Sequence, residues 1–331
     1  AVFRARTFHE LERHARKLPW ARFVPPGAPV RFRVTSRKSR LYHTDAIAER
    51  LADAAATRVG AVPASDGSGD AGPAGTREED DVYDYDDNDE AAAQLFIVRV
   101  VRDVCTVSAD SSGALLHRRG YRQAVAKAPL RETIAAAMLL GSEWPGTVPL
   151  IDPMCGSGTI PIEAALLARR IAPGASRRFA FQRWPEFDGA ISARIVGEAR
   201  EQELRRAPTP IRGSDRDAGA VEAARANAER AGVAADVELD QRPLSAIEPS
   251  MSCGWVVTNP PYGVRVADAG AVKDLYAALG NVLRARFRGW RLALLSPGES
   301  LERQVGVMLR ERFATLNGGI PVRLVTGEVQ P

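Results

Sequence analysis

A glycine-containing loop, DPMCGSGT from Asp152 to Thr159, lies between an apolar strand pattern and an apolar helix pattern. Gly156 and Gly158 allow a tight turn and a close approach of the backbone to a ligand, and the following helix N-terminus offers free N–H groups. A dinucleotide fingerprint needs a third glycine where Pro161 stands, and a phosphate-binding loop needs Gly-Lys-Ser/Thr. An acidic residue before the glycines repels pyrophosphate but can hold the ammonium group of an amino-acid cofactor. The loop therefore favours S-adenosylmethionine, with an ordinary strand-to-helix turn as the alternative.

The next predicted strand ends in acidic residues, in the sequence IRGSDRD. An acidic side chain at this end of the second strand binds the two ribose hydroxyls of a nucleoside ligand in doubly wound sheets, and we assign that role to Asp215. Asp217 is either a second contact or the N-cap of the helix that follows. The predicted cofactor contacts of the glycine loop are Asp152, Pro153, Cys155, Gly156, Ser157, Gly158 and Thr159.

The segment NPPYG follows the apolar strand pattern WVVT and supplies the candidate catalytic residues Asn259, Pro260, Pro261 and Tyr262. An exocyclic amine of a nucleobase is a poor nucleophile because its lone pair is delocalised into the ring. The Asn259 side-chain oxygen and the Pro260 carbonyl can each accept one N–H, which aims the lone pair at a sulfonium methyl group. Tyr262 can stack on a base that is flipped out. A proline-stiffened turn is the alternative.

The elements that must position these residues alternate strand and helix from about Pro149 onward, which predicts a doubly wound, mostly parallel sheet. The last predicted helix covers Ser300–Phe313. Asn317-Gly318-Gly319 lies between two apolar alternating runs and predicts a β-hairpin that closes the sheet. The fold class is therefore α/β, a Rossmann-like domain with a seven-stranded sheet and an antiparallel C-terminal hairpin.

A smaller α/β unit is expected before this domain, with a helix near His9–Leu18, a strand at Val30–Val34, a helix from Asp45 to about Ala56 and a strand pair at 95–110. The domain boundaries follow as 1–112 for this unit, 113–128 for a linker and 129–331 for the Rossmann-like domain. Residues from about 57 to 92 lack the apolar side chains of a core, which predicts a disordered acidic insertion.

The charge of the chain is unevenly distributed. The net charge is +4, but residues 66–90 alone carry eleven acidic residues and one basic residue, so the rest of the chain carries +14. Two groups of cations stand out, which we call the strand cluster and the linker cluster. The strand cluster is Arg31, Arg33, Arg37, Lys38 and Arg40, and the linker cluster is Arg118, Arg119 and Arg122. We predict that both bind RNA phosphates, although a charge run is often only a solvated surface.

Several function classes are disfavoured by the composition. The three cysteines form no CxxC pair and the four histidines lack metal-site spacing, so neither a disulfide framework nor a metal is expected. No apolar run reaches the length of a membrane span, and we expect a cytoplasmic monomer that binds no membrane. Cys155 and Cys253 could suggest attack on a pyrimidine, but Cys155 belongs to the cofactor loop and Cys253 precedes its strand.

Taken with the motifs DPMCGSGT, LLHRRGYR, SRKSRLYHTDAIAERL, RFAFQRWPEFD, NPPYG and NGGIPVRL, the chain resembles the THUMP-domain RNA methyltransferases that make N2-methylguanosine in ribosomal or transfer RNA. The resemblance implies an RNA-capturing THUMP domain, with a shortened ferredoxin-like region before it. It implies an S-adenosylmethionine site that includes Pro129 and Leu130. It also implies that Asn259–Tyr262 hold the target amine.

One position departs from the family. The acid that normally contacts the cofactor's adenine is replaced by Pro243, and we assign this contact to Asp240, with Ser245 as the alternative. LLHRRGYR and RFAFQRWPEFD resemble the bacterial ribosomal branch, so large-subunit (23S) ribosomal RNA is the expected substrate and transfer RNA the alternative. DNA adenine-N6 or protein glutamine-N5 methylation, and a catalytically silent RNA-binding factor, are further alternatives.

Overall fold

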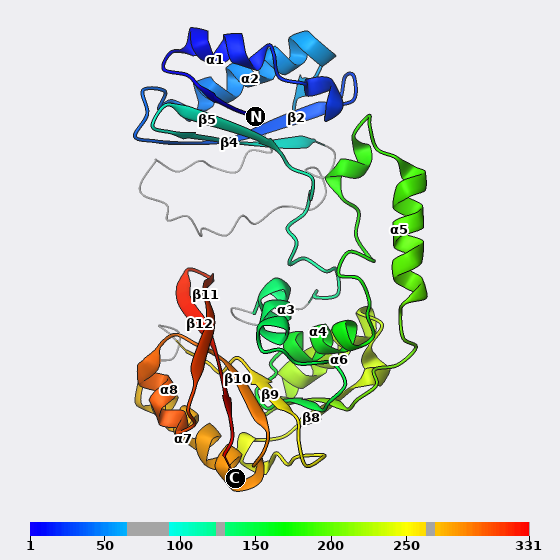
Figure 1. The fold of residues 1–331 in the computed structure, drawn as a ribbon, viewed down its shortest axis with the longest axis vertical. Coiled ribbons are helices and arrows are strands. Elements are labelled where there is room, and N and C mark those ends of the chain that lie inside the picture. The colour runs from blue at the N-terminus through cyan, green and yellow to red at the C-terminus, as the bar shows by residue number, and fades with distance from the viewer. Residues whose placement is uncertain (65–92, 124–129, 263–268, 331) are drawn as a thin grey trace. The chain divides into compact units, whose positions relative to one another are not determined.

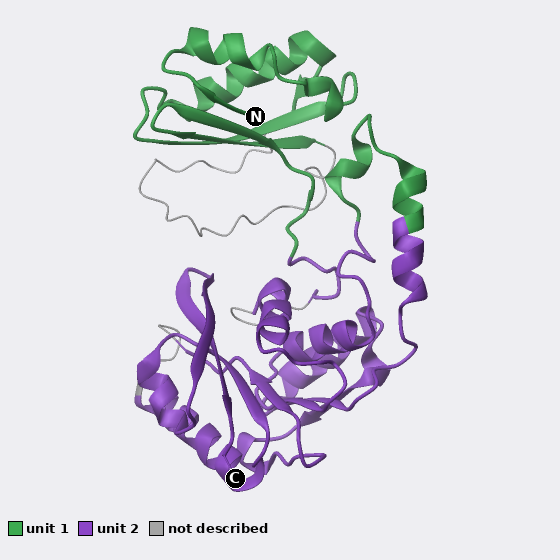
Figure 2. Cartoon of the chain, in the orientation of Figure 1, with its two compact units in different colours: residues 1–76, 83–116, 178–194 green, residues 77–82, 117–177, 195–331 purple. Residues whose placement is uncertain are grey.

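The computed structural model describes residues 1–64, 93–123, 130–262 and 269–330, which fall into two units (Figures 1 and 2). Among these residues, the first unit contains 1–64, 93–116 and 178–194 and the second contains the rest. The second unit thus starts near the expected linker. The stretch 178–194 belongs to the first unit, although the sequence places it far inside the Rossmann-like region.

The first unit is a five-stranded mixed sheet of order β1-β5-β4-β2-β3 with two helices. The strands are β1 (Val2–Arg4), β2 (Pro29–Arg37), β3 (Val62–Pro63), β4 (Gln94–Val101) and β5 (Val104–Ala109), and the helices are α1 (Phe8–Ala15) and α2 (Thr44–Val59). Strand β2 is parallel to β4, and β4 and β5 form the predicted antiparallel pair. Val30 is buried and Phe32 packs on the core, as the alternation along β2 predicts.

The predicted start of the insertion at about residue 57 was wrong. Helix α2 continues to Val59, ends at Gly60 in a left-handed conformation, and is followed by β3, which pairs with β2. Gly60 has φ +64°, which ends the helix and turns the chain into this short strand. Most of the predicted insertion, residues 65–92, lies outside the described residues.

Residues 178–194 attach to the first unit through aromatic and polar contacts. The short 3₁₀ turn Ala180–Arg183 precedes Trp184, whose indole N–H donates to the Gln94 side-chain oxygen at 2.7 Å. The Trp184 ring meets Phe23 edge to face at 5.0 Å. The motif RFAFQRWPEFD is therefore attached to the first unit through Trp184. Helix α5 (Gly189–Glu201) follows it and buries none of its side chains.

The second unit contains a seven-stranded sheet of order β11-β12-β10-β9-β6-β7-β8, which confirms the predicted Rossmann-like class. Its strands are β6 (Leu150–Asp152), β7 (Ile211–Asp215), β8 (Val237–Gln241), β9 (Trp255–Thr258), β10 (Arg291–Ser296), β11 (Arg310–Asn317) and β12 (Ile320–Glu328). The first five are parallel and β12 is antiparallel to β10. The strand order reverses between β6 and β9, and ligands of such sheets bind at this switch point.

Helices cover both faces of the larger sheet (Figure 1). Helices α3 (Glu132–Gly141), α4 (Thr159–Ala168) and α6 (Ala218–Arg230) pack on one face, and α7 (Ala269–Arg286) and α8 (Glu299–Val305) pack on the other. Alternate residues of a strand serve the two faces: Leu150 belongs to the first core and Ile151 to the second. The sheet is therefore buried on both sides, and its strand ends are left for ligands.

The predicted helix Ser300–Phe313 was wrong beyond its first half. Helix α8 ends at Val305 because Gly306 adopts a left-handed conformation with φ +65°. The residues from Arg310 onward form β11, which pairs with β12 across the predicted glycine turn, where Gly318 and Gly319 both have positive φ. The hairpin is thus confirmed and is longer than predicted. In the described part of the chain, no helix is long and apolar enough to cross a bilayer.

Candidate active site

The C-terminal ends of β6 and β9 lie side by side and carry the two central sequence motifs. Asp152 ends β6, and Thr258 ends β9 directly before Asn259. The Thr258 hydroxyl donates to Asp152 Oδ1 at 2.8 Å, and the Met154 backbone N–H donates to the same oxygen at 3.1 Å. The glycine loop and the end of the strand that leads into the Asn-Pro-Pro-Tyr segment are therefore joined by a hydrogen bond.

Asp152 is a fully buried carboxyl group, with 1% of its surface exposed. Burial raises its pKa to about 7, while the hydrogen bonds from Thr258 and Met154 oppose this effect and the nearby Asp215 adds to it. No arginine or lysine pairs with Asp152 among the described residues. This carboxyl group is consequently suited to a ligand that brings its own positive charge.

The glycine loop is held in place by β7. The Cys155 N–H donates to the Ser214 carbonyl at 2.9 Å, and the Gly156 N–H donates to Asp215 Oδ2 at 3.0 Å. Gly156 has φ +50°, and a Cβ atom added there would meet nothing within 4 Å, which leaves that side of the loop open to a ligand. A Cβ on Gly158 would meet Ala224 Cβ at 2.9 Å, so this second glycine lets α4 pack closely.

The two acidic residues after β7 have different roles. Asp217 is the N-cap of α6 and accepts from the Gly219 N–H at 2.9 Å, which confirms the capping alternative. Asp215 accepts from Gly156 and from the Asp217 N–H at 3.0 Å. Asp215 thus organises the loop, and its carboxylate has further lone pairs for ribose hydroxyls. The neighbouring Ser214 hydroxyl is buried and has no hydrogen-bond partner in the described structure.

The Asn259–Tyr262 segment presents an unused acceptor. The Asn259 side-chain oxygen is buried and has no hydrogen-bond partner among the described residues. Such an oxygen costs free energy unless a ligand supplies a donor. Pro260 is buried and Pro261 is exposed. The Tyr262 hydroxyl accepts from Asn317 Nδ2 at 2.8 Å, and burial raises the pKa of this tyrosine.

The linker cluster does not form the exposed patch that the sequence predicts. Arg119 pairs with Glu163 at 3.4 Å and Arg122 pairs with Glu132 at 3.5 Å, and each arginine side chain is 11% exposed. Arg122 also donates to the Thr159 hydroxyl at 2.7 Å and to the Leu130 carbonyl at 2.6 Å. We therefore withdraw Arg119 and Arg122 from the RNA-contacting set, because their guanidinium groups are used inside the second unit. Arg118 is half-buried.

Arg122 explains how Leu130 and Thr159 come together. Leu130 is buried in the core, beside the start of α3, and Thr159 is the first residue of α4. Arg122 donates hydrogen bonds to both residues, so it links the end of the glycine loop at Thr159 to the segment that leads into α3. Pro129 lies outside the described residues. Glu163, the only charged residue in helix α4, is the signal in the sequence that could have identified the ion pair with Arg119.

Asp240 and the strand cluster are half-buried or exposed. Asp240 lies at the end of β8 and pairs with Arg242 at 3.7 Å. In β2, Arg31 and Arg33 are half-buried, on the face opposite Phe32, and Arg37 is exposed. Lys38 and Arg40, which follow the strand, are exposed. No group of three or more metal-ligating side chains was found in the part of the chain that the structure describes.

Comparison with known proteins places this geometry in a family. Residues 119–325 match the model of the UPF0020 family, described as an RMKL-like methyltransferase domain. The slr0064 protein of Synechocystis sp., provisionally described as an RNA methyltransferase, is 39% identical over 226 residues, 68% of this chain and 59% of that protein. A ribosomal RNA large subunit methyltransferase K/L of Methylococcus capsulatus is 34% identical over 99% of this chain and 43% of its own length. The chain thus spans about half the length of these relatives.

Solved structures with a similar fold cover the whole length of this chain. SMU.472, provisionally described as a methyltransferase and complexed with SAH, superimposes with a TM-score of 0.82 at 31% identity, covering 100% of this chain and 83% of that one. A protein from Listeria monocytogenes, described as a predicted N6-adenine-specific DNA methylase, gives a TM-score of 0.80 at 32% identity, covering 100% of this chain and 81% of that one. Both units therefore occur together in relatives.

Proposed function

Because the chain belongs to the UPF0020 family of RMKL-like methyltransferase domains, we propose that it transfers a methyl group from S-adenosylmethionine to the exocyclic N2 amine of a guanine in RNA. The substrate we favour is the large-subunit ribosomal RNA, because the K/L relative covers 99% of this chain and is named for that substrate. The relative complexed with SAH supports S-adenosylmethionine as the cofactor.

The observation that carries the proposal is the unpartnered oxygen of Asn259. This oxygen is a buried acceptor directly after β9, the strand that pairs with β6. Asp152 ends β6 and the glycine loop follows it, so the acceptor and the loop lie at the same edge of the sheet. An N–H of a nucleobase amine satisfies such an acceptor, whereas a hydroxyl or carbon nucleophile calls for a base that is absent from this segment.

The cofactor site fits the chemistry of S-adenosylmethionine. Asp152 is a buried carboxyl group with which no described arginine or lysine pairs, and it would pair with the ammonium group. Gly156 leaves open space beside the loop, and Asp215 and the unpartnered Ser214 hydroxyl lie at the end of β7, where a ribose would bind. Asp240 remains the proposed adenine contact.

The bound cofactor would supply an electrophilic methyl group on its sulfonium. Asn259 Oδ1 and the Pro260 carbonyl each accept one N–H of the guanine amine, which turns the nitrogen lone pair toward that methyl group. Tyr262 stacks on the base. The methyl group would pass from the cofactor's sulfur to the amine nitrogen, and the nitrogen would then lose one proton to solvent, so the residues of this chain need not supply a strong base.

The first unit would capture the RNA. We propose that it is the THUMP domain and that the strand cluster, with Arg118, contacts phosphates. Strand β2 carries Arg31, Arg33 and Arg37 on the face opposite Phe32, which packs on the core, and Lys38 and Arg40 follow the strand. This arrangement suits contacts with the phosphate backbone that hold an RNA without reading its sequence.

A direct assay tests this proposal against the alternatives. The protein is incubated with labelled S-adenosylmethionine and, separately, with ribosomal RNA, transfer RNA and DNA from cells that lack the gene, and the labelled nucleoside is identified. Label in N2-methylguanosine of large-subunit RNA is expected. Label in N6-methyladenine of DNA, which the description of the Listeria relative makes the second candidate, would overturn the proposal, as would the absence of transfer.

A further inference from the structure

The β11–β12 hairpin is hydrogen-bonded to the Asn-Pro-Pro-Tyr segment. Asn317, the last residue of β11, donates from Nδ2 to the Tyr262 hydroxyl at 2.8 Å, across 55 residues of sequence. The Tyr262 side chain is half-buried and packs on the main core of the second unit. Asn317 is the one hydrogen-bond partner of the Tyr262 hydroxyl among the described residues. The far end of this ring is therefore fixed by the hairpin.

Strand register places the tip of the hairpin at the ligand edge of the sheet. Ser296, the last residue of β10, is opposite Arg323 of β12, and Arg323 is opposite Ala314 of β11. The hairpin residues 315–322 therefore extend past the end of β10. Since β9 and β10 are parallel, this is the edge at which Asn259 follows β9. The hairpin tip thus reaches beyond the sheet on the side of the candidate active site.

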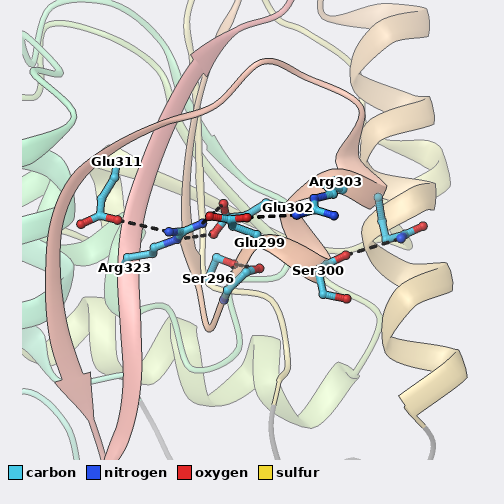
Figure 3. A network of polar contacts seen from close by, with 9 residues as sticks. Ser296, Glu299, Ser300, Glu302, Arg303, Glu311 and Arg323 are labelled. Carbon is cyan, nitrogen blue, oxygen red and sulfur yellow. Dashed lines mark hydrogen bonds and ion pairs between the residues drawn. The ribbon is translucent and has the colours of Figure 1, made fainter.

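An ion-pair network attaches the hairpin to the rest of the unit (Figure 3). Arg323 donates to both oxygens of Glu302 on α8, at 2.8 and 2.6 Å, and to Glu311 on β11 at 3.2 Å. Glu302 is 8% exposed, and bidentate pairs of this kind combine charge with a defined geometry. The network lies where the projecting part of the hairpin begins. It therefore fixes the base of the hairpin tip that carries Asn317.

The turn itself does not depend on Asn317. The two turn residues with positive φ are Gly318 and Gly319, and Asn317 is an extended strand residue. Its amide is thus not required to make the turn. The contact that the Asn317 side chain makes is the hydrogen bond to Tyr262.

From these contacts we propose that Asn317 is a positioning residue that fixes the Tyr262 ring for stacking on the target base, which makes the β11–β12 hairpin part of the target-base site. This inference rests on the proposed function, because it takes Tyr262 to be the stacking residue. Without the hydrogen bond, the ring is free to leave the plane in which the base must lie, and the methyl transfer slows although the cofactor still binds.

A double-mutant cycle tests this coupling. Asn317→Ala and Tyr262→Phe each remove the hydrogen bond, and each is expected to lower kcat by about fivefold to tenfold, the effect of one hydrogen bond. The double variant should be no slower than the slower single variant, because both changes break the same contact. Affinity for SAH should stay within about twofold. Leu316→Ala, the matched control on the neighbouring strand residue, should resemble the unmodified protein.

Three results would overturn the inference: multiplicative effects in the double variant, an unaffected rate in Asn317→Ala, or an equal loss in Leu316→Ala. The cycle is run on whichever acceptor the unmodified protein methylates. Coupling on an acceptor other than guanine N2 would therefore refute the proposed function and leave the hairpin inference standing.

A spectroscopic measurement makes the test independent of activity. The chain has six tyrosines, and in protein labelled with 3-fluorotyrosine the resonance of Tyr262 is identified by its loss in Tyr262→Phe. Asn317→Ala should shift that resonance and leave the other five in place, whereas Leu316→Ala should shift none. An unchanged Tyr262 resonance in Asn317→Ala would show that the contact does not hold the ring.

Discussion

The two groups of arginines, the strand cluster and the linker cluster, look alike in the sequence but are used differently. The side chains of Arg119 and Arg122 in the linker cluster are only 11% exposed and pair with Glu163 and Glu132, whereas Lys38 and Arg40 of the strand cluster are exposed. The difference comes from the acidic partners, which sit in apolar elements of the second unit. A run of cations in the sequence therefore does not by itself identify a nucleic-acid surface, because buried carboxylates can pair with its members, as Glu163 and Glu132 do here.

The largest effect is expected at Arg122. Arg122→Ala removes the donor to Thr159 and Leu130, and it leaves the buried Glu132 carboxylate without its ion-pair partner. We expect the free energy of unfolding of the second unit to fall by about 3–5 kcal/mol, measured by urea denaturation. Adding Glu132→Gln should recover part of the loss. A loss in the free energy of unfolding below about 1 kcal/mol would mean that Arg122 does not stabilise the second unit, and the contrast between the two clusters would fail.

Asp152 sharpens the comparison, since it is a buried carboxyl group for which the described protein supplies no cation. Its pKa of about 7 exceeds the usual value of an aspartate, so the neutral form prevails below pH 7 and the charged form above it. Affinity for the ammonium-bearing SAH should therefore rise about tenfold from pH 6 to pH 8, as measured by calorimetry. Asp152→Asn should bind weakly at both values. A pH dependence that persists in this variant would assign it to another group.

The smallest effects belong to the strand cluster. Lys38→Gln and Arg40→Gln should each leave the free energy of unfolding within about 0.5 kcal/mol. Each should weaken RNA binding several-fold at low salt and reduce the slope of log affinity against log salt concentration by about one. Binding titrations at several salt concentrations measure this slope. An unchanged slope in both variants would remove these residues from the RNA surface.

Most of the fold of the second unit, and the position of the two central motifs at its strand ends, could be predicted, because strands, helices and glycine loops are local patterns. What could not be predicted are contacts across long stretches of sequence. Thr258 bonds to Asp152 across 106 residues, Asn317 to Tyr262 across 55 and Arg122 to Thr159 across 37. The helix expected through Phe313 also failed, because a helical and an extended pattern meet at Gly306 and only pairing with β12 decides between them.

The claim that Asn259 orients the target amine is tested most directly by single-turnover methyl transfer with Asn259→Ala. The account predicts that transfer falls by at least about a hundredfold, the effect of losing a preorganised transition-state contact, while affinity for SAH, held by Asp152 and the glycine loop, stays within about twofold. Transfer at a rate near that of the unmodified protein, with intact cofactor binding, would contradict the account.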